Sequence, residues 1–275
     1  MVDVQDHERL ERKEAVTTSV RSLTYGSLMM ALVFIATYSI RIPIPFTQGY
    51  IHPGDSMIFI AALLFGWRFG ALVGGFGSAM ADILGGYAHW AFPTLVIKGI
   101  MGAVAGWMGH DLAKKHDRRL DLYLTALVSL IWVAFCVGGR MMLTGAFTTN
   151  ASGLLALIDE AGSVQELSSL VQRVNLWLAL AAAVVPAGLV AARYILQRLQ
   201  ANTLSFAQFL GMVLSGLWMV IGYYIAAGFL YDSFIIPVFS IPSNILQFTG
   251  GMVIAFPVLA AVQKSGSFFT GPPEN

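Results

Sequence analysis

The stretch that decides the fold runs from Tyr50 to Gly106 and reads YIHPGDSMIFIAALLFGWRFGALVGGFGSAMADILGGYAHWAFPTLVIKGIMGAVAG. It is apolar enough to lie in a lipid bilayer, yet it carries Asp55, Asp82 and Lys98 and is rich in glycine. Charge inside the hydrocarbon of a membrane is costly and is usually kept for a function. The stretch therefore predicts a polar cavity built inside a membrane protein.

The composition of the whole chain also places it in the membrane. Of its 275 residues, 57% are hydrophobic and only 11% are charged, with a mean hydropathy of +0.71. Soluble domains carry about 25% charged residues. The net charge of +1 comes without a basic patch, so nucleic acid is not an expected partner. The one cysteine, Cys136, excludes an intrachain disulfide and a cysteine metal cluster. We expect no cofactor and no metal.

Apolar runs predict an all-α integral membrane protein with about eight transmembrane segments. Helices are expected because lipid-exposed backbone must satisfy its own hydrogen bonds, and the runs show no strand-like alternation. The expected segments are about Ser22–Ile42, Ser56–Phe65, Gly70–Leu84, Thr94–Met108, Leu122–Leu143, Leu176–Leu196, Phe209–Leu230 and Ser243–Val262.

The second and third segments are short for membrane spans, and a tight turn from Gly66 to Phe69 joins them. Either they are interrupted helices that line a polar site near the middle of the bilayer, or their true boundaries lie a few residues further out. The sequence leaves both interpretations open.

Basic residues gather in alternate loops, which predicts that both termini are cytoplasmic in a multi-pass protein of the cell membrane. On this topology residues 1–21 and 265–275 are cytoplasmic tails. The longest outer segment, Phe147–Val174, has a pattern that predicts one short amphipathic helix.

Small residues recur at helical spacing in three segments. In the third and fourth segments these stripes predict close helix packing. Their members are Gly70, Gly74, Gly77 with Ser78, and Ala81 in the third segment, and Gly99, Gly102 with Ala103, and Gly106 in the fourth. In the first segment, Ser27 and Ala31 form a small pair that is either an internal contact or a docking face for another membrane subunit.

Several polar side chains could carry function. Asp82 and Lys98 either form a buried ion pair or contact a ligand, and Asp55 could cap the second segment. The loop between Gly85 and Pro93 holds Tyr87, His89 and Trp90, which suit either an interfacial anchor or a flat heteroaromatic ligand.

A second polar group lies towards the C-terminus. Asn244 and Gln247 are about one turn apart in an apolar segment, and Tyr223 lies in the segment before it. They form either interhelical hydrogen bonds or part of a binding pocket. The chain has no GxxxxGK[ST] phosphate loop, so it does not itself hydrolyse ATP, and it has no HExxH motif. We expect a protein without catalytic residues rather than an enzyme.

With these residues named, the chain resembles the substrate-binding (S) components of energy-coupling factor (ECF) vitamin transporters, in the riboflavin, hydroxymethylpyrimidine and pyridoxine branch. The resemblance rests on three features of the opening stretch: G-D at Gly54, A-D-x-x-x-G from Ala81, and W-x-x-x-T-x-x-x-K-G-x-x-G from Trp90. It resumes in GLWMVIGYYIAAGF, Gly216–Phe229, and in SIPSNILQFTGGMVIAFP, Ser240–Pro257.

The resemblance implies a core of six helices that captures a small water-soluble vitamin or precursor from outside. The liganded protein would topple against a transmembrane coupling subunit, driven by two cytoplasmic ATPases. Ser27 and Ala31 occupy the place of the family's Ala-xxx-Ala contact with the coupling subunit. The expected pocket consists of Tyr87, His89, Trp90, Lys98, Tyr223, Asn244 and Gln247. Phe46, Gln48 and Tyr50 would form the gating loop, with Asp55 and Asp82 as structural polar residues.

The chain departs from a six-helix member at residues 117–205, which insert two more helices and an outer amphipathic piece between core parts 22–116 and 206–264. The insertion could cover the pocket, mediate dimerisation or replace part of the coupling arrangement. A stand-alone secondary transporter, with Asp82 and Lys98 in proton coupling, is the alternative function.

Overall fold

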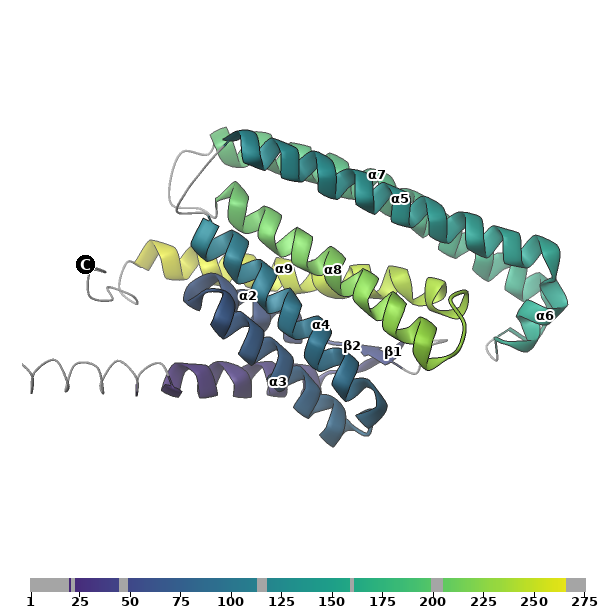
Figure 1. Cartoon of the computed structure of the whole chain (residues 1–275), viewed down its shortest axis with the longest axis horizontal. Helices are drawn as coiled ribbons and strands as arrows, with labels where there is room; N and C mark the ends of the chain where they lie inside the picture. The colour runs from purple at the N-terminus through teal and green to yellow at the C-terminus, as the bar shows by residue number, and fades with distance from the viewer. Residues whose placement is uncertain are drawn as a thin grey trace, which may run out of the picture.

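The structure, a computed structural model, describes residues 20, 23–44, 49–112, 118–158, 161–198 and 205–265. It is an elongated bundle of helices whose long members run roughly side by side (Figure 1). The first helix covers Leu23–Ser39. The others are α2 (Gly54–Phe65), α3 (Trp67–Gly85), α4 (Ala88–Gly106), α5 (Arg118–Thr149), α6 (Ala151–Ala156), α7 (Val164–Arg198), α8 (Phe206–Leu230) and α9 (Ile241–Ser265).

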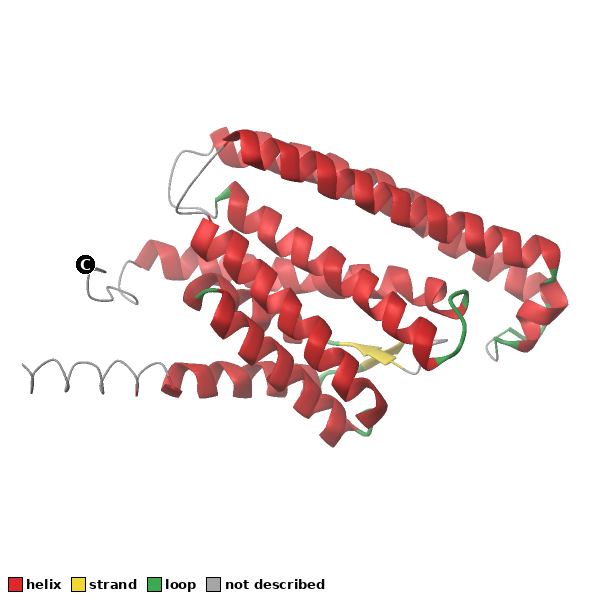
Figure 2. Ribbon diagram, in the orientation of Figure 1, coloured by secondary structure: helices red, strands yellow, loops and turns green. Residues whose placement is uncertain are grey.

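Short irregular elements complete the described chain. A π-helical turn, η1 (Trp107–Asp111), extends α4, and a 3₁₀ turn, η3 (Ile236–Ser240), precedes α9. Strands β1 (Ile42–Ile44) and β2 (Gly49–Ile51) pair antiparallel, with Pro43 opposite Tyr50. Among the described residues these two are the only strands (Figure 2).

The helical membrane fold agrees with the sequence, because each expected segment overlaps one helix. Five helices are long and apolar enough to cross a bilayer: Ala88–Asp111, Arg119–Thr149, Val164–Leu196, Phe206–Leu230 and Ile236–Val262. The first helix and α2 are apolar but shorter. At about 1.5 Å per residue, the 12 residues of α2 reach about 18 Å, less than the roughly 30 Å hydrocarbon core.

Two boundaries differ from the sequence expectation. Gly66 alone forms the turn between α2 and α3. Its φ of +85° is a backbone conformation that glycine adopts without strain. Trp67, Arg68 and Phe69, which were expected in the turn, belong to α3. Helix α3 is therefore 19 residues long and is not a short segment. Likewise α4 begins at Ala88 and contains Pro93, so His89 and Trp90 are helical rather than part of a loop.

The segment expected to form a separate amphipathic helix is divided differently. Helices α5 and α7 are 32 and 35 residues long, and the six-residue α6 is the one helix among the described residues between them. Residues from Val164 onward join the first turns of α7. The expected amphipathic helix is therefore continuous with the membrane helix α7. Its apolar face includes Leu167 and Val171, which are buried.

The small-residue stripes pack α3 against α4, as the sequence predicts. A Cβ atom added at Gly102 would collide with the backbone of Gly70, and one added at Gly74 would lie 2.8 Å from the carbonyl oxygen of Lys98. Gly77 faces the other way, towards Met30 and Val33 of the first helix. Helix α2 lies among these elements and is buried along most of its length.

Helices α5 and α7 form a hairpin at one side of the bundle (Figure 1). The indole N–H of Trp132 donates to the carbonyl oxygen of Ala181 at 3.0 Å and ties the two helices together. The hairpin contacts the remaining bundle through α8 and α9. Its two connections to the bundle start close together, because a Cβ atom at Gly109 would lie 3.3 Å from Cα of Gln208.

Candidate functional site

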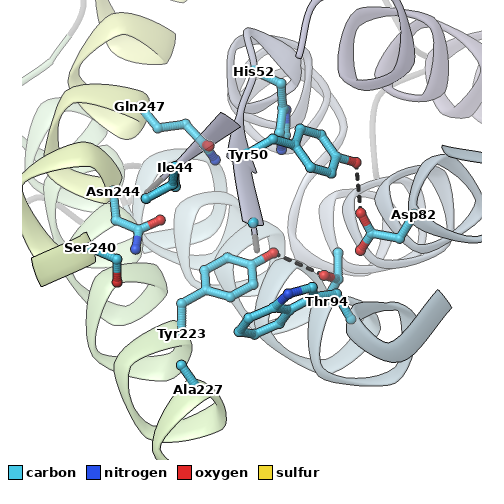
Figure 3. A pocket seen from close by; sticks show the side chains of 12 residues that line it. Ile44, Tyr50, His52, Asp82, Thr94, Tyr223, Ala227, Ser240, Asn244 and Gln247 are labelled. Carbon is cyan, nitrogen blue, oxygen red and sulfur yellow. Dashed lines mark hydrogen bonds between the residues drawn. The ribbon is translucent and has the colours of Figure 1, made fainter. Parts of the chain in front are cut away.

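A buried cavity lies below the β1–β2 hairpin, between α3, α4, α8 and α9 (Figure 3). Its volume is about 40 Å³, room for a few water molecules. The lining residues are Ile44, Gly49, Tyr50, His52, Asp82, Trp90, Thr94, Tyr223, Ala227, Ser240, Asn244 and Gln247.

One wall of the cavity is aromatic. The rings of Trp90 and Tyr223 meet edge to face with centroids 5.7 Å apart. The Tyr223 hydroxyl donates to Thr94 Oγ1 at 3.1 Å, which fixes the phenol against α4. Trp90 and Thr94 are four residues apart and therefore share one face of α4. The arrangement presents flat apolar surface beside fixed hydroxyl groups.

The β-hairpin closes the cavity through Tyr50. Its hydroxyl donates to Asp82 Oδ1 at 2.6 Å, and its ring packs 4.6 Å from that of Tyr87. Burial, followed by the nearby Asp82 carboxylate, raises the pKa of Tyr50, so the phenol stays protonated and remains a donor. Arg41, just before β1, donates to the carbonyl oxygen of Gly85 at 2.8 Å and ties the same hairpin to the end of α3.

His52 follows the hairpin and is 9% exposed. Burial, followed by the positive charge of Lys98, lowers its pKa to about 3. The ring is therefore neutral at physiological pH. Its Nδ1 accepts a hydrogen bond from the Gly54 amide at 3.1 Å, which leaves the proton of the neutral ring on Nε2.

The wall opposite the aromatic residues consists of amides. Asn244 and Gln247 each keep only 6% of their surface exposed and extend from α9 into the cavity (Figure 3). The nearby Ser240 hydroxyl is already used, because it donates to the carbonyl oxygen of Pro237 at 2.8 Å.

A buried ion pair supports this amide wall. Lys98 Nζ pairs with Asp55 Oδ1, and both side chains are fully buried. The Gln247 amide donates to Asp55 Oδ2 at 3.1 Å, and Met219 Sδ lies 2.8 Å from Lys98 Nζ. The cluster joins α2, α4, α8 and α9, and it corrects two expectations. Lys98 pairs with Asp55 instead of Asp82, and Asp55 does not cap α2, since Pro53 occupies the cap position.

The structure gathers part of the expected pocket. Trp90, Tyr223, Asn244 and Gln247 line the cavity with Tyr50 of the expected gating loop. The other three expected pocket residues do not line it. His89 is exposed, because it precedes the buried Trp90 directly and so lies on a different face of α4. Tyr87 packs its ring against that of Tyr50. Lys98 forms an ion pair with Asp55. Phe46 and Gln48 lie outside the described residues.

Sequence reasoning missed three of the polar lining residues, Thr94, His52 and Ser240. Thr94 could have been found from the four-residue spacing of Trp90, Thr94 and Lys98, which places all three on one side of a helix. His52 gave no comparable signal, because its position depends on how the hairpin folds back over α2.

The sequence is similar to that of known membrane transport proteins. The family model for the S component of ECF-type riboflavin transporters matches residues 17–201 and 177–264. A thiamine precursor transporter, HmpT, of Lactococcus lactis is 30% identical over 124 residues, which are 45% of this chain and 70% of that protein. An uncharacterized protein of Pyrococcus woesei, described by its place in the gap 3' region, is 52% identical over 115 residues, 40% of this chain and 77% of that protein. The chain therefore belongs to the family of ECF-type transporter S components.

Proposed function

We propose that this protein is the substrate-binding subunit of an ATP-driven ECF importer and captures a small water-soluble vitamin or vitamin precursor from outside the cell. The observation that carries the proposal is the buried cavity, which combines the Trp90 and Tyr223 rings with the Asn244 and Gln247 amides. Aromatic surface with a few fixed polar groups is typical of small-molecule sites. The Lactococcus relative, a thiamine precursor transporter, supports a vitamin precursor as the ligand class.

In this proposal the β1–β2 hairpin faces the outside and acts as the gate. The cavity of about 40 Å³ is smaller than a vitamin, and in this proposal the hairpin moves to admit a ligand. The hairpin is held by the Tyr50–Asp82 hydrogen bond and by Arg41, two contacts that can break without disturbing the helices. The described ends of the first helix and α9 lie at the opposite end of the molecule, which is consistent with cytoplasmic termini (Figure 1).

Delivery then takes place by toppling against a transmembrane coupling subunit that two cytoplasmic ATPases drive. Ser27 and Ala31 are both exposed on the first helix, as a contact with such a subunit requires. Leu28 is also exposed there, and small residues beside it let another helix approach closely. The core is proposed to comprise six helices, with the α5–α7 hairpin as an addition.

Native mass spectrometry of the purified full-length protein, followed by titration calorimetry with the compound found, tests the proposal. We expect a vitamin-like molecule that binds below micromolar concentration. Trp90→Ala and Asn244→Ala should each weaken its binding by about tenfold or more, whereas Trp177→Ala, at an exposed position of α7, should not. A folded protein that binds no such compound, or unchanged affinity in both cavity variants, contradicts the proposal.

Transport assays separate the two candidate functions. Uptake by cells that contain this protein should disappear when the ECF ATPases are deleted. Uptake that survives the deletion but collapses with an uncoupler would support the stand-alone secondary transporter instead.

A further inference from the structure

The cavity offers a ligand side-chain acceptors, alongside the His52 Nε2–H and Trp90 Nε1–H donors. Three of its hydroxyl donors are already used: Tyr50 donates to Asp82, Tyr223 to Thr94 and Ser240 to the Pro237 carbonyl. The amide N–H₂ group of Gln247 must face Asp55, because a carboxylate there can only accept. The Gln247 carbonyl oxygen is therefore the atom left for a ligand.

Asp82 offers the second acceptor. The side chain is 4% exposed, and one oxygen accepts from Tyr50. The other oxygen, Oδ2, is buried and receives no hydrogen bond of good geometry from the described residues, although Thr94 lies alongside it. A buried carboxylate oxygen without a donor is costly, and a ligand N–H group would remove that cost.

The charges around the cavity point in the same direction. Among the lining residues that the structure describes, Asp82 is the only acidic or basic one besides His52, which is neutral. Lys98 is paired with Asp55 behind the wall, and Arg41 lies outside the lining residues, where it donates to the Gly85 carbonyl. Among the described lining residues, none carries a positive charge that could compensate a carboxylate or phosphate on a ligand.

We propose that this cavity selects heteroaromatic ligands that present N–H donors to Asp82 Oδ2 and Gln247 Oε1, and that it rejects ligands with an acid group. The inference rests on the proposed capture function and narrows its substrate class. An acidic ligand would lie beside the Asp82 carboxylate without a counter-ion, whereas an amino-substituted or protonated ring would supply donors to the Asp82 and Gln247 oxygens.

Matched pairs of compounds test the selection on the purified full-length protein by titration calorimetry. The pairs are the aminopyrimidine precursor of thiamine and its phosphate ester, thiamine and its monophosphate, pyridoxamine and its phosphate ester, and nicotinamide and nicotinate. We expect at least one member with N–H donors and no acid group to bind below micromolar concentration, and its acidic counterpart to bind at least about 100-fold more weakly.

Variants then assign the selection to Asp82. Asp82→Asn keeps an acceptor for Tyr50 but removes the charge, so it should weaken binding of the preferred ligand by roughly 10- to 100-fold and reduce the discrimination against its acidic counterpart. Asp232→Asn is the matched control. It removes the same charge from an exposed turn, where asparagine also tolerates the φ of +50°.

The outcomes distinguish this inference from the function on which it rests. If an acidic compound binds as tightly as its partner, or if Asp82→Asn leaves both affinities unchanged, the selection is overturned and the capture function stands. If none of the compounds binds below micromolar concentration and native mass spectrometry also finds no ligand, the capture function itself is contradicted.

Discussion

At the residue scale, the buried Asp55–Lys98 pair is the contact that other parts of the site depend on. Both side chains are fully buried, and each is the counter-ion of the other. Asp55 also fixes the orientation of the Gln247 amide, so the pair determines which face of that amide the cavity presents. A polar cluster of this kind gives one arrangement of four helices rather than several.

Removing one partner of this pair should be more damaging than removing both. Lys98→Met leaves the Asp55 carboxylate buried without a counter-ion, and we expect a loss of about 3–5 kcal/mol in the free energy of unfolding. The double variant Asp55→Asn, Lys98→Met removes both charges and should recover part of the loss. Thermal unfolding of the wild type, both single variants and the double variant in one detergent measures the coupling. Additive losses would show that the two side chains act independently.

His52 should make stability depend on pH. Its pKa is about 3 in the folded protein, because of burial and then Lys98, against about 6.5 in the unfolded chain. Between these values the unfolded state binds more protons, so stability falls as pH drops below about 6.5. At pH 5 the loss should reach about 2 kcal/mol.

Melting curves at pH 7.5 and pH 5 of the wild type and His52→Asn check this expectation. Asparagine keeps an acceptor for the Gly54 amide but does not titrate. The variant should therefore lose most of the difference between the two pH values. An equal pH dependence in both proteins would assign the effect to other groups.

At the element scale, glycine determines how closely α3 and α4 approach. Besides Gly70 and Gly102, Gly106 packs directly on the start of α3, where an added Cβ atom would lie 2.6 Å from Cα of Trp67. Close backbone contact of this kind maximises van der Waals packing, which drives helix association in a membrane because lipid is as apolar as the side chains. It also sets the distance between Asp82 on α3 and the cavity face of α4.

Replacing a glycine at this crossing should therefore destabilise the protein. Gly102→Ala forces the two backbones apart and is expected to cost about 1–3 kcal/mol. Gly138→Ala, on α5, is the control, because nothing lies within 4 Å of its added Cβ atom and alanine favours a helix. The midpoint of thermal unfolding should fall for the first variant and stay or rise for the second. The reverse order would contradict the packing argument.

At the scale of the whole molecule, the α5–α7 hairpin has the geometry of an addition to a complete core. None of the described residues that line the cavity comes from α5, α6 or α7. The chain enters the α5–α7 hairpin after Gly109 and returns to the core before Gln208, and these two residues lie close together. Surface on α8 and α9 that the hairpin now covers would meet lipid in its absence, and lipid imposes no hydrophobic penalty on it.

A variant in which a short flexible linker joins Leu112 to Ser205 should therefore fold and bind ligand. We expect a monodisperse protein in detergent whose affinity for the compound found by native mass spectrometry equals that of the full chain. Size-exclusion chromatography and titration calorimetry measure the two properties. A folded variant that has lost binding would show that the hairpin shapes the cavity.

Most of the fold could be predicted from the sequence, and about half of the site. Apolar runs gave the helices, but α3 and α4 each extend beyond the runs, because Gly66 alone makes one turn and Pro93 is accommodated inside α4. The sequence left open whether Asp82 and Lys98 pair, and the structure pairs Lys98 with Asp55 instead. Asp55 lies close to Lys98 only after α2 packs between α4 and α9.

The sequence alone determined that this is a helical membrane protein of the S-component type, because hydropathy, glycine spacing and local motifs are properties of neighbouring residues. Only the tertiary structure decided which polar groups meet. Gln247 reaches Asp55 across 192 positions of the chain, and Tyr50 reaches Asp82 by way of a folded hairpin. Whether two groups form a hydrogen bond depends on a fraction of an ångström in the distance between them, and for distant segments helix packing sets that distance.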